Sequence, residues 1–150
     1  MNKPKHRVGW TEYSLLINEL VKQMNNDDFE PELIITIARG GLPGAVQLSH
    51  QFEAPMTIAE VSKYDENDEA GELEIESLPE LPDLDTSALI FDDISDTGET
   101  MRTITMFAEW SPRVEVKTAT MHVKPETSFV PDYWVTRTDK WVVYPWEETL

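Results

Sequence analysis

A stretch of thirteen residues, positions 88–100, constrains the fold of this chain more than any other part; it reads ALIFDDISDTGET. Its first four residues are apolar and too few for a helix, which indicates a short strand buried in a sheet. The run ends on two acids, Asp92 and Asp93, and a polar turn containing Gly98 follows. Helical spacing of apolar residues then runs from about position 99 to 110. A strand, a tight turn and a helix in this order predict the repeating unit of an α/β sheet.

The turn after this strand also predicts a ligand site. Backbone N–H groups at a helix start lack partners within the helix, so they bind anions such as phosphate, and the hydroxyls of Thr97 and Thr100 add donors. Carboxylates at the end of the strand suit sugar hydroxyls or a metal ion, and open α/β sheets bind ligands at the carboxyl ends of their strands. The alternative is a turn without a ligand, because Asp, Ser, Thr and Gly all favour turns.

The same stretch resembles the signature of a known family. An apolar run, two acids and the pattern D-T-G-x-T at positions 96–100 resemble the phosphoribosyl diphosphate (PRPP) motif of type I phosphoribosyltransferases. Aspartic proteases lack the acid pair before D-T-G, and a Walker A motif needs Lys where this chain has Glu99. The resemblance implies an α/β fold with a central parallel sheet flanked by helices, a flexible β-hairpin loop and a small C-terminal hood. It also implies that Asp92 and Asp93 hold the ribose hydroxyls, directly or through Mg²⁺, and that the 5′-phosphate is bound by Asp96, Thr97, Gly98, Glu99 and Thr100.

Length and charge bound the class of protein. With 150 residues of which 40% are hydrophobic, we expect one domain over residues 1–150, with a core at about 8–123 and a hood at about 124–150. No apolar run suits a membrane span or a signal peptide. The absence of Cys excludes disulfides and thiol catalysis and agrees with a cytoplasmic location. A net charge of −17 repels nucleic acid and anionic membranes, so neither is expected as a partner.

The first third of the chain predicts a helix, a strand and a second anion-binding loop. Apolar residues recur at helical spacing across positions 11–24, and Leu33–Ala38 is a continuous β-rich run typical of a doubly buried strand. This strand leads into Arg39, Gly40 and Gly41, followed by a proline that suits a helix start. The sequence resembles the family's pyrophosphate loop, which implies that these three residues bind the leaving pyrophosphate. In relatives the peptide that follows the residue matching Arg39 is often cis. The alternative is a glycine-rich strand-to-helix turn without a ligand.

The middle of the chain predicts a hairpin. Positions 56–62 indicate a strand, positions 63–71 are highly charged without apolar periodicity, and alternating apolar residues at positions 73–78 indicate a returning, half-exposed strand. The place matches the family's catalytic flexible loop. The resemblance implies that Ser62 and Tyr64 close over PRPP and help to exclude water. The alternative is an ordinary solvated hairpin tip.

The last third predicts one more strand and an aromatic hood. Val114–Val123 alternates apolar and polar residues, which predicts a strand partly exposed on one face. The segment after it is rich in Trp, Tyr and Pro, with short strands expected at 133–135 and Trp141–Val143. Its spacing, with Lys-Pro at 124, Asp-Tyr at 132 and Trp-x-x-x-Pro-Trp-acid from 141, resembles the hood of bacterial xanthine-guanine phosphoribosyltransferases.

The hood resemblance implies a purine site. Trp141 would stack on the base, Lys124 would donate to a 6-oxo group, and the backbone around Val142 would read the edge near position 2. Stacking of a base on an aromatic ring contributes about 1–3 kcal/mol. Glu147 falls where relatives place an acid near Mg²⁺, so the implied metal ligands are Asp92, Asp93 and Glu147. The tryptophans at positions 134 and 146 are interpreted as core residues.

These resemblances imply a Mg²⁺-dependent enzyme of purine salvage that acts as a homo-oligomer, dimer or tetramer. It would transfer 5-phosphoribose from PRPP to N9 of a 6-oxopurine (guanine, xanthine or hypoxanthine), giving the nucleoside 5′-monophosphate and pyrophosphate. Asp92 and Asp93 would stabilise a ribosyl cation, and Asp96 would face N7 and take up the proton lost at N9. Two alternatives stay open. A PRPP-sensing regulator would need a basic nucleic-acid surface, and a phosphoribosyltransferase for another base would usually lack an Asp at position 96.

Overall fold

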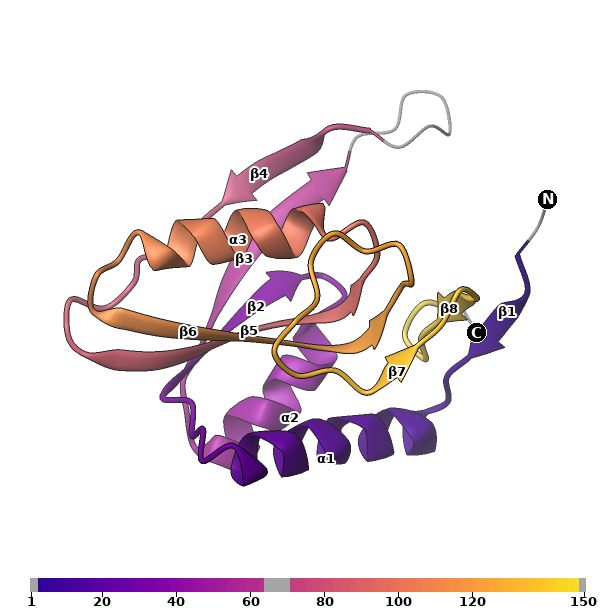
Figure 1. Cartoon of the computed structure of the whole chain (residues 1–150), viewed down its shortest axis with the longest axis horizontal. Coiled ribbons are helices and arrows are strands. Elements are labelled where there is room, and N and C mark those ends of the chain that lie inside the picture. Colours follow the sequence, from indigo (N-terminus) through magenta and orange to yellow (C-terminus); the bar gives the residue numbers. More distant parts are fainter. Residues whose placement is uncertain (1–2, 64–70, 149–150) are drawn as a thin grey trace.

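A mostly parallel sheet forms the centre of the protein, with helices on both of its faces (Figure 1). The computed structural model describes residues 3–63 and 71–148. The strands of this sheet are β2 (Leu33–Ala38), β3 (Met56–Lys63), β4 (Leu73–Ser77), β5 (Thr86–Ser95), β6 (Val114–Val123) and β7 (Thr136–Arg137). Among the described residues their order is β4-β3-β2-β5-β6-β7, and every neighbouring pair is parallel except β3 and β4. The predicted α/β fold with a central sheet flanked by helices is confirmed.

Helices α1 (Trp10–Asn26) and α2 (Leu42–Phe52) lie against one face of the sheet, and α3 (Glu99–Glu109) lies against the other (Figure 1). Each buries an apolar stripe, because side chains three and four positions apart share one side of a helix. In α1 the buried residues are Tyr13, Leu16, Ile17, Leu20, Val21 and Met24. Within the described part of the chain, no helix has the length and apolar character needed to cross a lipid bilayer.

The middle of the core is supplied by β5 and its neighbour β2. Successive side chains of a strand point to opposite faces. Leu89 and Phe91 therefore pack with the residues of α1 and α2, whereas Ile90 packs with those of α3. All three side chains are fully buried. A strand that is covered on both faces has no polar side, which explains its continuous apolar sequence.

The chain reverses its winding direction between β2 and β5. These strands lie side by side and parallel, with Ile35 opposite Ile90. From β2 the chain passes through α2 to β3 on one side of this pair, and from β5 it passes through α3 to β6 on the other side. The loops that follow the two strands therefore leave toward opposite faces of the sheet. Such a switch point leaves a crevice at the carboxyl ends of the strands, where ligands bind in open α/β sheets.

The hood is fixed by the N-terminal residues as well as by β6. Strand β1 (Lys5–Arg7) pairs in parallel with β8 (Trp141–Val143), and the N–H of Val8 donates to the carbonyl of Val143 at 2.8 Å. Figure 1 shows this small sheet beside the carboxyl end of β6, away from the β3–β4 hairpin. The expected strand Trp141–Val143 is confirmed. The run Lys-His-Arg carries no strand signal, so β1 is not predictable from its own residues.

The predicted hairpin is formed by β3 and β4, which pair antiparallel with Val61 opposite Ile75. Ile75 is 45% exposed, in agreement with a half-exposed returning strand. The connection at positions 64–70, including Tyr64, lies outside the described residues. The expected flexibility of that connection stays a prediction.

The expectation that β6 is partly exposed on one face is wrong for its second half. Thr118, Thr120 and His122 are all buried, with at most 3% of their surface exposed. The cause is the hood, because Asp132 accepts a hydrogen bond from the hydroxyl of Thr118 at 3.1 Å and the hydroxyl of Tyr144 lies 2.8 Å from Nδ1 of His122. Polar side chains at alternate positions of this strand therefore face protein instead of water.

The strand expected at positions 133–135 is also misplaced. An isolated bridge at Tyr133 and the two-residue strand β7 at Thr136–Arg137 stand in its place. Backbone bonds to β6 are present at Tyr133, whose N–H donates to the carbonyl of Thr118 and whose carbonyl accepts from the N–H of Thr120, both at 3.0 Å. The carboxylate of Asp132 accepts further bonds from the N–H and the hydroxyl of Thr118 at 2.9 and 3.1 Å. Regular strand pairing begins only at Thr136.

We predict that Leu89→Ala lowers the free energy of unfolding by about 2–5 kcal/mol, because it removes a fully buried side chain from the central strand and leaves a cavity. Leu15→Ala is the matched control, since Leu15 in α1 is 63% exposed, and its effect is expected within about 0.5 kcal/mol. Urea unfolding followed by circular dichroism measures both. Equal losses in the two variants would contradict the assignment of Leu89 to the core.

Candidate active site

The end of β5 carries two carboxylates that are partly withdrawn from water. Asp92 and Asp93 are half-buried, and the N–H of Asp93 donates to Oδ1 of Asp92 at 2.8 Å, while the N–H of Ile94 donates to Oδ1 of Asp93 at 2.7 Å. Burial raises the pKa of Asp92 well above its ordinary value, and the charge of Asp93 adds to the rise. Burial also raises the pKa of Asp93 to about 6, with a contribution from Glu147. A positive group or a metal ion would stabilise this acidic pair.

The turn between β5 and α3 is held from behind by the segment that follows β6. Gly98 caps α3 with a φ of 92°, in the left-handed region, and an added Cβ would lie 2.6 Å from the backbone nitrogen of Phe129. The N–H of Ser128 donates to the carbonyl of Thr97 at 2.9 Å, and the hydroxyl of Ser95 donates to the carbonyl of Phe129 at 2.8 Å. These contacts fix the turn, so that the first turn of α3 faces a cavity.

That first cavity has a volume of about 170 Å³ and joins the turn to the end of β3. It is lined by Lys63, Asp92, Asp93, Ile94, Ser95, Asp96, Thr97, Gly98, Thr100 and Met101. All the described predicted phosphate-binding residues except Glu99 are in this set. Glu99 begins α3 with its side chain exposed, and its N–H contacts the hydroxyl of Thr97 at 3.3 Å.

Lys63 is a site residue that the sequence reasoning missed. Its Nζ donates to the hydroxyl of Thr97 at 3.4 Å, which places a positive charge beside the predicted phosphate position. Ser62, which the sequence favoured, instead donates to Oε1 of Glu76 on β4 at 2.8 Å. The sequence does contain a signal for Lys63. Lysines and arginines are few in a chain of net charge −17, and this one ends a strand directly before the expected closing loop.

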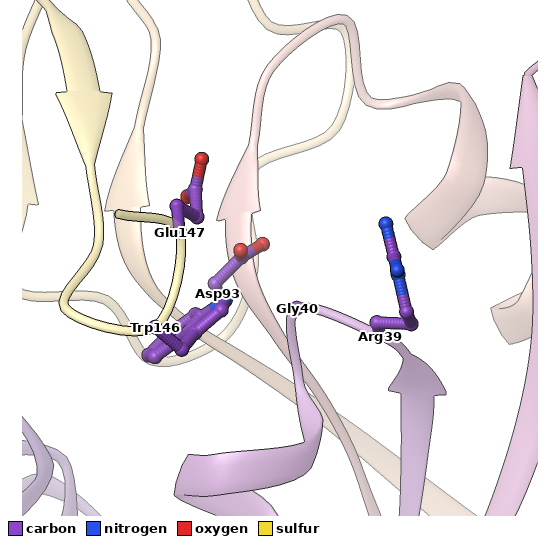
Figure 2. A pocket seen from close by; sticks show the side chains of 5 residues that line it. All are labelled: Arg39, Gly40, Asp93, Trp146 and Glu147. Atoms are coloured by element: carbon purple, nitrogen blue, oxygen red, sulfur yellow. The ribbon is translucent and has the colours of Figure 1, made fainter. Parts of the chain in front are cut away.

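A second, larger cavity of about 780 Å³ lies between the ends of β2 and β5 and the hood. It is lined by Arg39, Gly40, Asp93, Trp146 and Glu147 (Figure 2). In Figure 2, Arg39 stands on one side, Trp146 and Glu147 stand on the other, and Asp93 lies between them. Within the described residues Arg39 takes part in no ion pair, so its guanidinium is free to bind an anion.

The glycines of the loop after β2 permit very close packing. A Cβ at position 40 would overlap the carboxylate of Asp93, and one at position 41 would collide with the side chain of Thr36 and the carbonyl of Ile37. Glycine at both positions therefore brings the loop into contact with the acidic turn. The cis peptide of this loop joins Ala38 to Arg39, one bond before the position that the resemblance suggested.

The predicted purine-binding residues lie in the hood beyond the two cavities. Lys124 is buried, and its Nζ donates to the carbonyls of Asp139, at 3.4 Å, and of Lys140. An ammonium group has three donors, so one is left for a ligand. Trp141 follows directly and is 56% exposed, whereas Val142 is buried. The structure thus places the ammonium of Lys124 against the two residues that precede Trp141. Neither Lys124 nor Trp141 lines either of the two cavities.

Trp146 is a second residue that the sequence reasoning undervalued. It packs against the core and stacks on Tyr144, with ring centroids 4.9 Å apart and an interplanar angle of 4°. Its ring also lines the larger cavity. The signal was its place directly before Glu147 in the hood motif. Trp134 is half-buried, as a partly packed residue would be.

The three acids implied as metal ligands do not form a ready-made cage. In residues 3–63 and 71–148, no three His, Asp or Glu side chains converge to hold a metal ion. Mg²⁺ is commonly bound by one or two carboxylates together with oxygens of a phosphorylated substrate. The partly desolvated carboxylates of Asp92 and Asp93 are the donors that such a shared site requires, so the residues present fit the ion.

Two loops that meet at an acidic strand end surround the two cavities. The sequence model described as the phosphoribosyl transferase domain matches residues 9–150. The chain belongs to the phosphoribosyl transferase domain family. The family inferred from the motif at positions 96–100 is thereby confirmed.

This phosphoribosyltransferase domain is similar to several purine enzymes. A crystal structure of a purine phosphoribosyltransferase from Pyrococcus horikoshii is 36% identical, with a TM-score of 0.84, over 97% of this chain and 95% of that one. A xanthine-guanine phosphoribosyltransferase from Idiomarina loihiensis is 27% identical over 147 residues, which cover 95% of this chain and 87% of the relative. A Helicobacter pylori xanthine-guanine-hypoxanthine phosphoribosyltransferase at 23% identity has a TM-score of 0.84 over 95% of this chain and 94% of that one, and supports the fold alone.

We predict that Asp93→Asn stabilises the protein at neutral pH when divalent metal is chelated. The raised pKa of Asp93, about 6, means that the folded state binds more protons than the unfolded state between pH 4 and 6, so stability falls as pH rises through this window. The amide of Asn does not titrate, so the variant does not lose stability in this window. The difference in free energy of unfolding between Asp93→Asn and wild type should be absent near pH 4 and reach at least about 1 kcal/mol above pH 6.

Thermal unfolding of wild type and variant from pH 4 to 8 measures this difference. Glu19→Gln, the same chemical change at an exposed position of α1, is the control and should show no such pH dependence. A stabilisation by Asp93→Asn that grows toward acid pH would contradict the raised pKa of Asp93.

Proposed function

We propose that this protein transfers 5-phosphoribose from PRPP to N9 of a 6-oxopurine and releases pyrophosphate, as a Mg²⁺-dependent enzyme of purine salvage. In this proposal residues 1–150 act as one domain, with a core at about 8–123 and a hood at about 124–150. The observation that carries the proposal is that Asp93 lines both cavities, one beside the start of α3 and one beside Arg39. A ribose with a phosphate on C5 and a diphosphate on C1 has anions at two ends and hydroxyls between them, which matches this order of groups.

The 5′-phosphate would occupy the smaller cavity. The N-terminus of α3 offers unpaired N–H groups and a positive dipole end, and the hydroxyls of Thr97 and Thr100 line the same space. Lys63 supplies a full positive charge there. These groups reverse the sign of the local potential in a strongly acidic protein.

The diphosphate would occupy the larger cavity. Arg39 offers a planar guanidinium that binds two oxygens at once, and Gly40 lets the backbone approach closely because no side chain intervenes. Mg²⁺, held by Asp92, Asp93 and the diphosphate oxygens with Glu147 nearby, would supply charge neutralisation of the leaving group when bound. The part of the larger cavity between Arg39 and Glu147 has room for this group.

Asp92 and Asp93 would hold the ribose hydroxyls at the switch point. Their negative charge lies where positive charge develops on the ribosyl carbon as pyrophosphate leaves, which stabilises the transition state without a covalent intermediate. Asp96 would accept the proton lost from the base. Its side chain lines the smaller cavity and is exposed, so a base presented from the hood can reach it.

A 6-oxopurine is supported by the hood residues and by the names of the relatives. The third proton of the Lys124 ammonium is suited to a 6-oxo group, and Trp141 offers an exposed ring for stacking beside the backbone of Val142. Relatives named xanthine-guanine phosphoribosyltransferase match most of the chain. The competing regulator would need a basic surface, and the chain has twelve Lys and Arg against twenty-nine Asp and Glu.

We predict that purified protein with Mg²⁺ and PRPP forms nucleotides from guanine, xanthine or hypoxanthine faster than from adenine or orotate. Pyrophosphate release with each base measures the rates. Asp96→Asn should lower kcat by about 10²–10⁴-fold, the usual contribution of a general base. Faster turnover of adenine or orotate would sink the 6-oxopurine assignment, and binding of PRPP without turnover would favour the regulator.

We predict that Lys63→Ala raises the KM for PRPP about tenfold with little change in kcat, because it removes a charge-assisted contact to the 5′-phosphate. Lys63→Arg should restore most of the affinity. Lys22→Ala is the control, since Lys22 is an exposed lysine of α1, and it should leave KM unchanged. Equal KM values for Lys63→Ala and Lys22→Ala would remove Lys63 from the site.

A further inference from the structure

Tyr144 connects the hood to the acidic turn through a buried chain of hydrogen bonds. Its hydroxyl donates to the main-chain carbonyl of Asp93 at 3.1 Å and lies 2.8 Å from Nδ1 of His122. Both side chains are almost fully buried, at 2% and 1% exposure. A hydroxyl has a single proton, so while it donates to Asp93 it must accept from His122. With the hydroxyl proton on the Asp93 carbonyl, the imidazole carries its own proton on Nδ1.

The surroundings keep both side chains of this chain uncharged. Burial lowers the pKa of His122 to about 4, with His6 adding to the effect, and burial raises the pKa of Tyr144. Near neutral pH the imidazole is uncharged and the phenol keeps its proton. The chain then runs from Nδ1 of His122 to the hydroxyl of Tyr144 and from that hydroxyl to the carbonyl of Asp93.

Tyr144 also contacts the hood residues that line the larger cavity. Its ring stacks on Trp146 at 4.9 Å, and its N–H donates to Oε1 of Glu147 at 3.3 Å. The N–H of Glu147 in turn donates to the carbonyl of Tyr144 at 3.1 Å. Asp93, Trp146 and Glu147 line the same cavity, and Arg39 stands on its other side (Figure 2). The Tyr144 side chain thus contacts both the turn that carries Asp93 and the segment that carries Trp146 and Glu147.

We propose that Tyr144, oriented by His122, is a positioning residue that holds the Asp92–Asp93 turn and the Trp146–Glu147 segment in the relative placement that phosphoribosyl transfer needs. This inference rests on the proposed function, because it concerns the same site. Loss of the hydroxyl leaves the Asp93 carbonyl without this buried partner, so the adjoining peptide can rotate and shift the carboxylate. A displacement of about 1 Å in a catalytic group costs on the order of 100-fold in rate.

The test is Tyr144→Phe, which removes the hydroxyl and keeps the ring on Trp146. We expect kcat to fall about 10–100-fold, the range for groups that orient metal-binding side chains. The KM for the purine should stay nearly constant, because Lys124 and Trp141 are unaltered. A lower kcat at constant KM distinguishes positioning from a general loss of structure. A general loss of structure would change both kcat and KM and lower the unfolding temperature steeply.

Tyr13→Phe is the matched control. Tyr13 is 1% exposed and packs edge-on against the same Trp146 ring, with centroids 5.2 Å apart and an interplanar angle of 84°. In the described part of the chain its hydroxyl has no hydrogen-bond partner. Removal of this hydroxyl should therefore leave kcat unchanged.

His122 provides a second, independent pair of variants and a spectroscopic measurement. His122→Asn keeps an N–H donor close to the position of Nδ1 and should retain more activity than His122→Leu, which has none. In ¹⁵N NMR of the wild type near neutral pH, His122 should be a neutral Nδ1–H imidazole, and in Tyr144→Phe this tautomer should lose its dominance. Should one variant fail to fold by circular dichroism, the other pair decides.

Three results would overturn the inference. Equal kcat for Tyr144→Phe and Tyr13→Phe would remove the positioning role, and an Nε2–H tautomer of His122 in the wild type would remove the chain. A wild type that transfers no phosphoribose to any base would overturn the proposed function and this role with it. An active wild type with an unimpaired Tyr144→Phe variant would overturn this inference alone.

Discussion

The divergence of the chain after two adjacent parallel strands is the constraint on which the rest of the structure depends. Because β2 turns toward α2 and β5 turns toward α3, the loops that follow the two strands lead away from each other and leave a crevice at the carboxyl ends. The loop after β2 supplies Arg39 and Gly40, and the end of β5 supplies the acidic pair and the start of α3. Gly40 packs directly on the carboxylate of Asp93, so the two loops form one continuous surface. The site thus follows from strand order and from the absence of a side chain at one position.

The electrostatics of the site oppose those of the whole molecule. A chain of net charge −17 repels a phosphorylated sugar at long range, and the acidic pair adds a local cost because burial raises the pKa of both carboxyls. Lys63, Arg39 and the start of α3 provide the opposing positive potential at two separate corners. A cost in stability of this kind is common at functional sites. In the proposed function the acidic pair offsets this cost, because its charge would stabilise a sugar that carries developing positive charge.

Much of the fold and part of the site were predictable from local pattern. The bounds of β2 and β6, the acidic turn and the glycine loop each have a signal in consecutive residues, because strand burial and turn chemistry act over short distances. The pairing of β1 with β8 had no such signal, since a polar Lys-His-Arg run becomes a strand only when a distant partner is present. The buried state of Thr120 and His122 likewise depends on the hood. Lys63 and Trp146 lie beside residues that the motifs singled out, but only the folded chain shows which neighbour faces the cavity.

The small sheet of β1 and β8 joins the beginning of the described chain to the segment that carries Trp141 and Val142. Trp141 lies opposite Lys5 in this pairing, and Val142 lies opposite His6. The orientation of the hood is therefore set in part by residues more than a hundred positions away in the sequence. Substitutions in β1 would therefore shift the segment that the proposed function assigns to the nucleobase, while the residues at the ends of β2 and β5 stay the same.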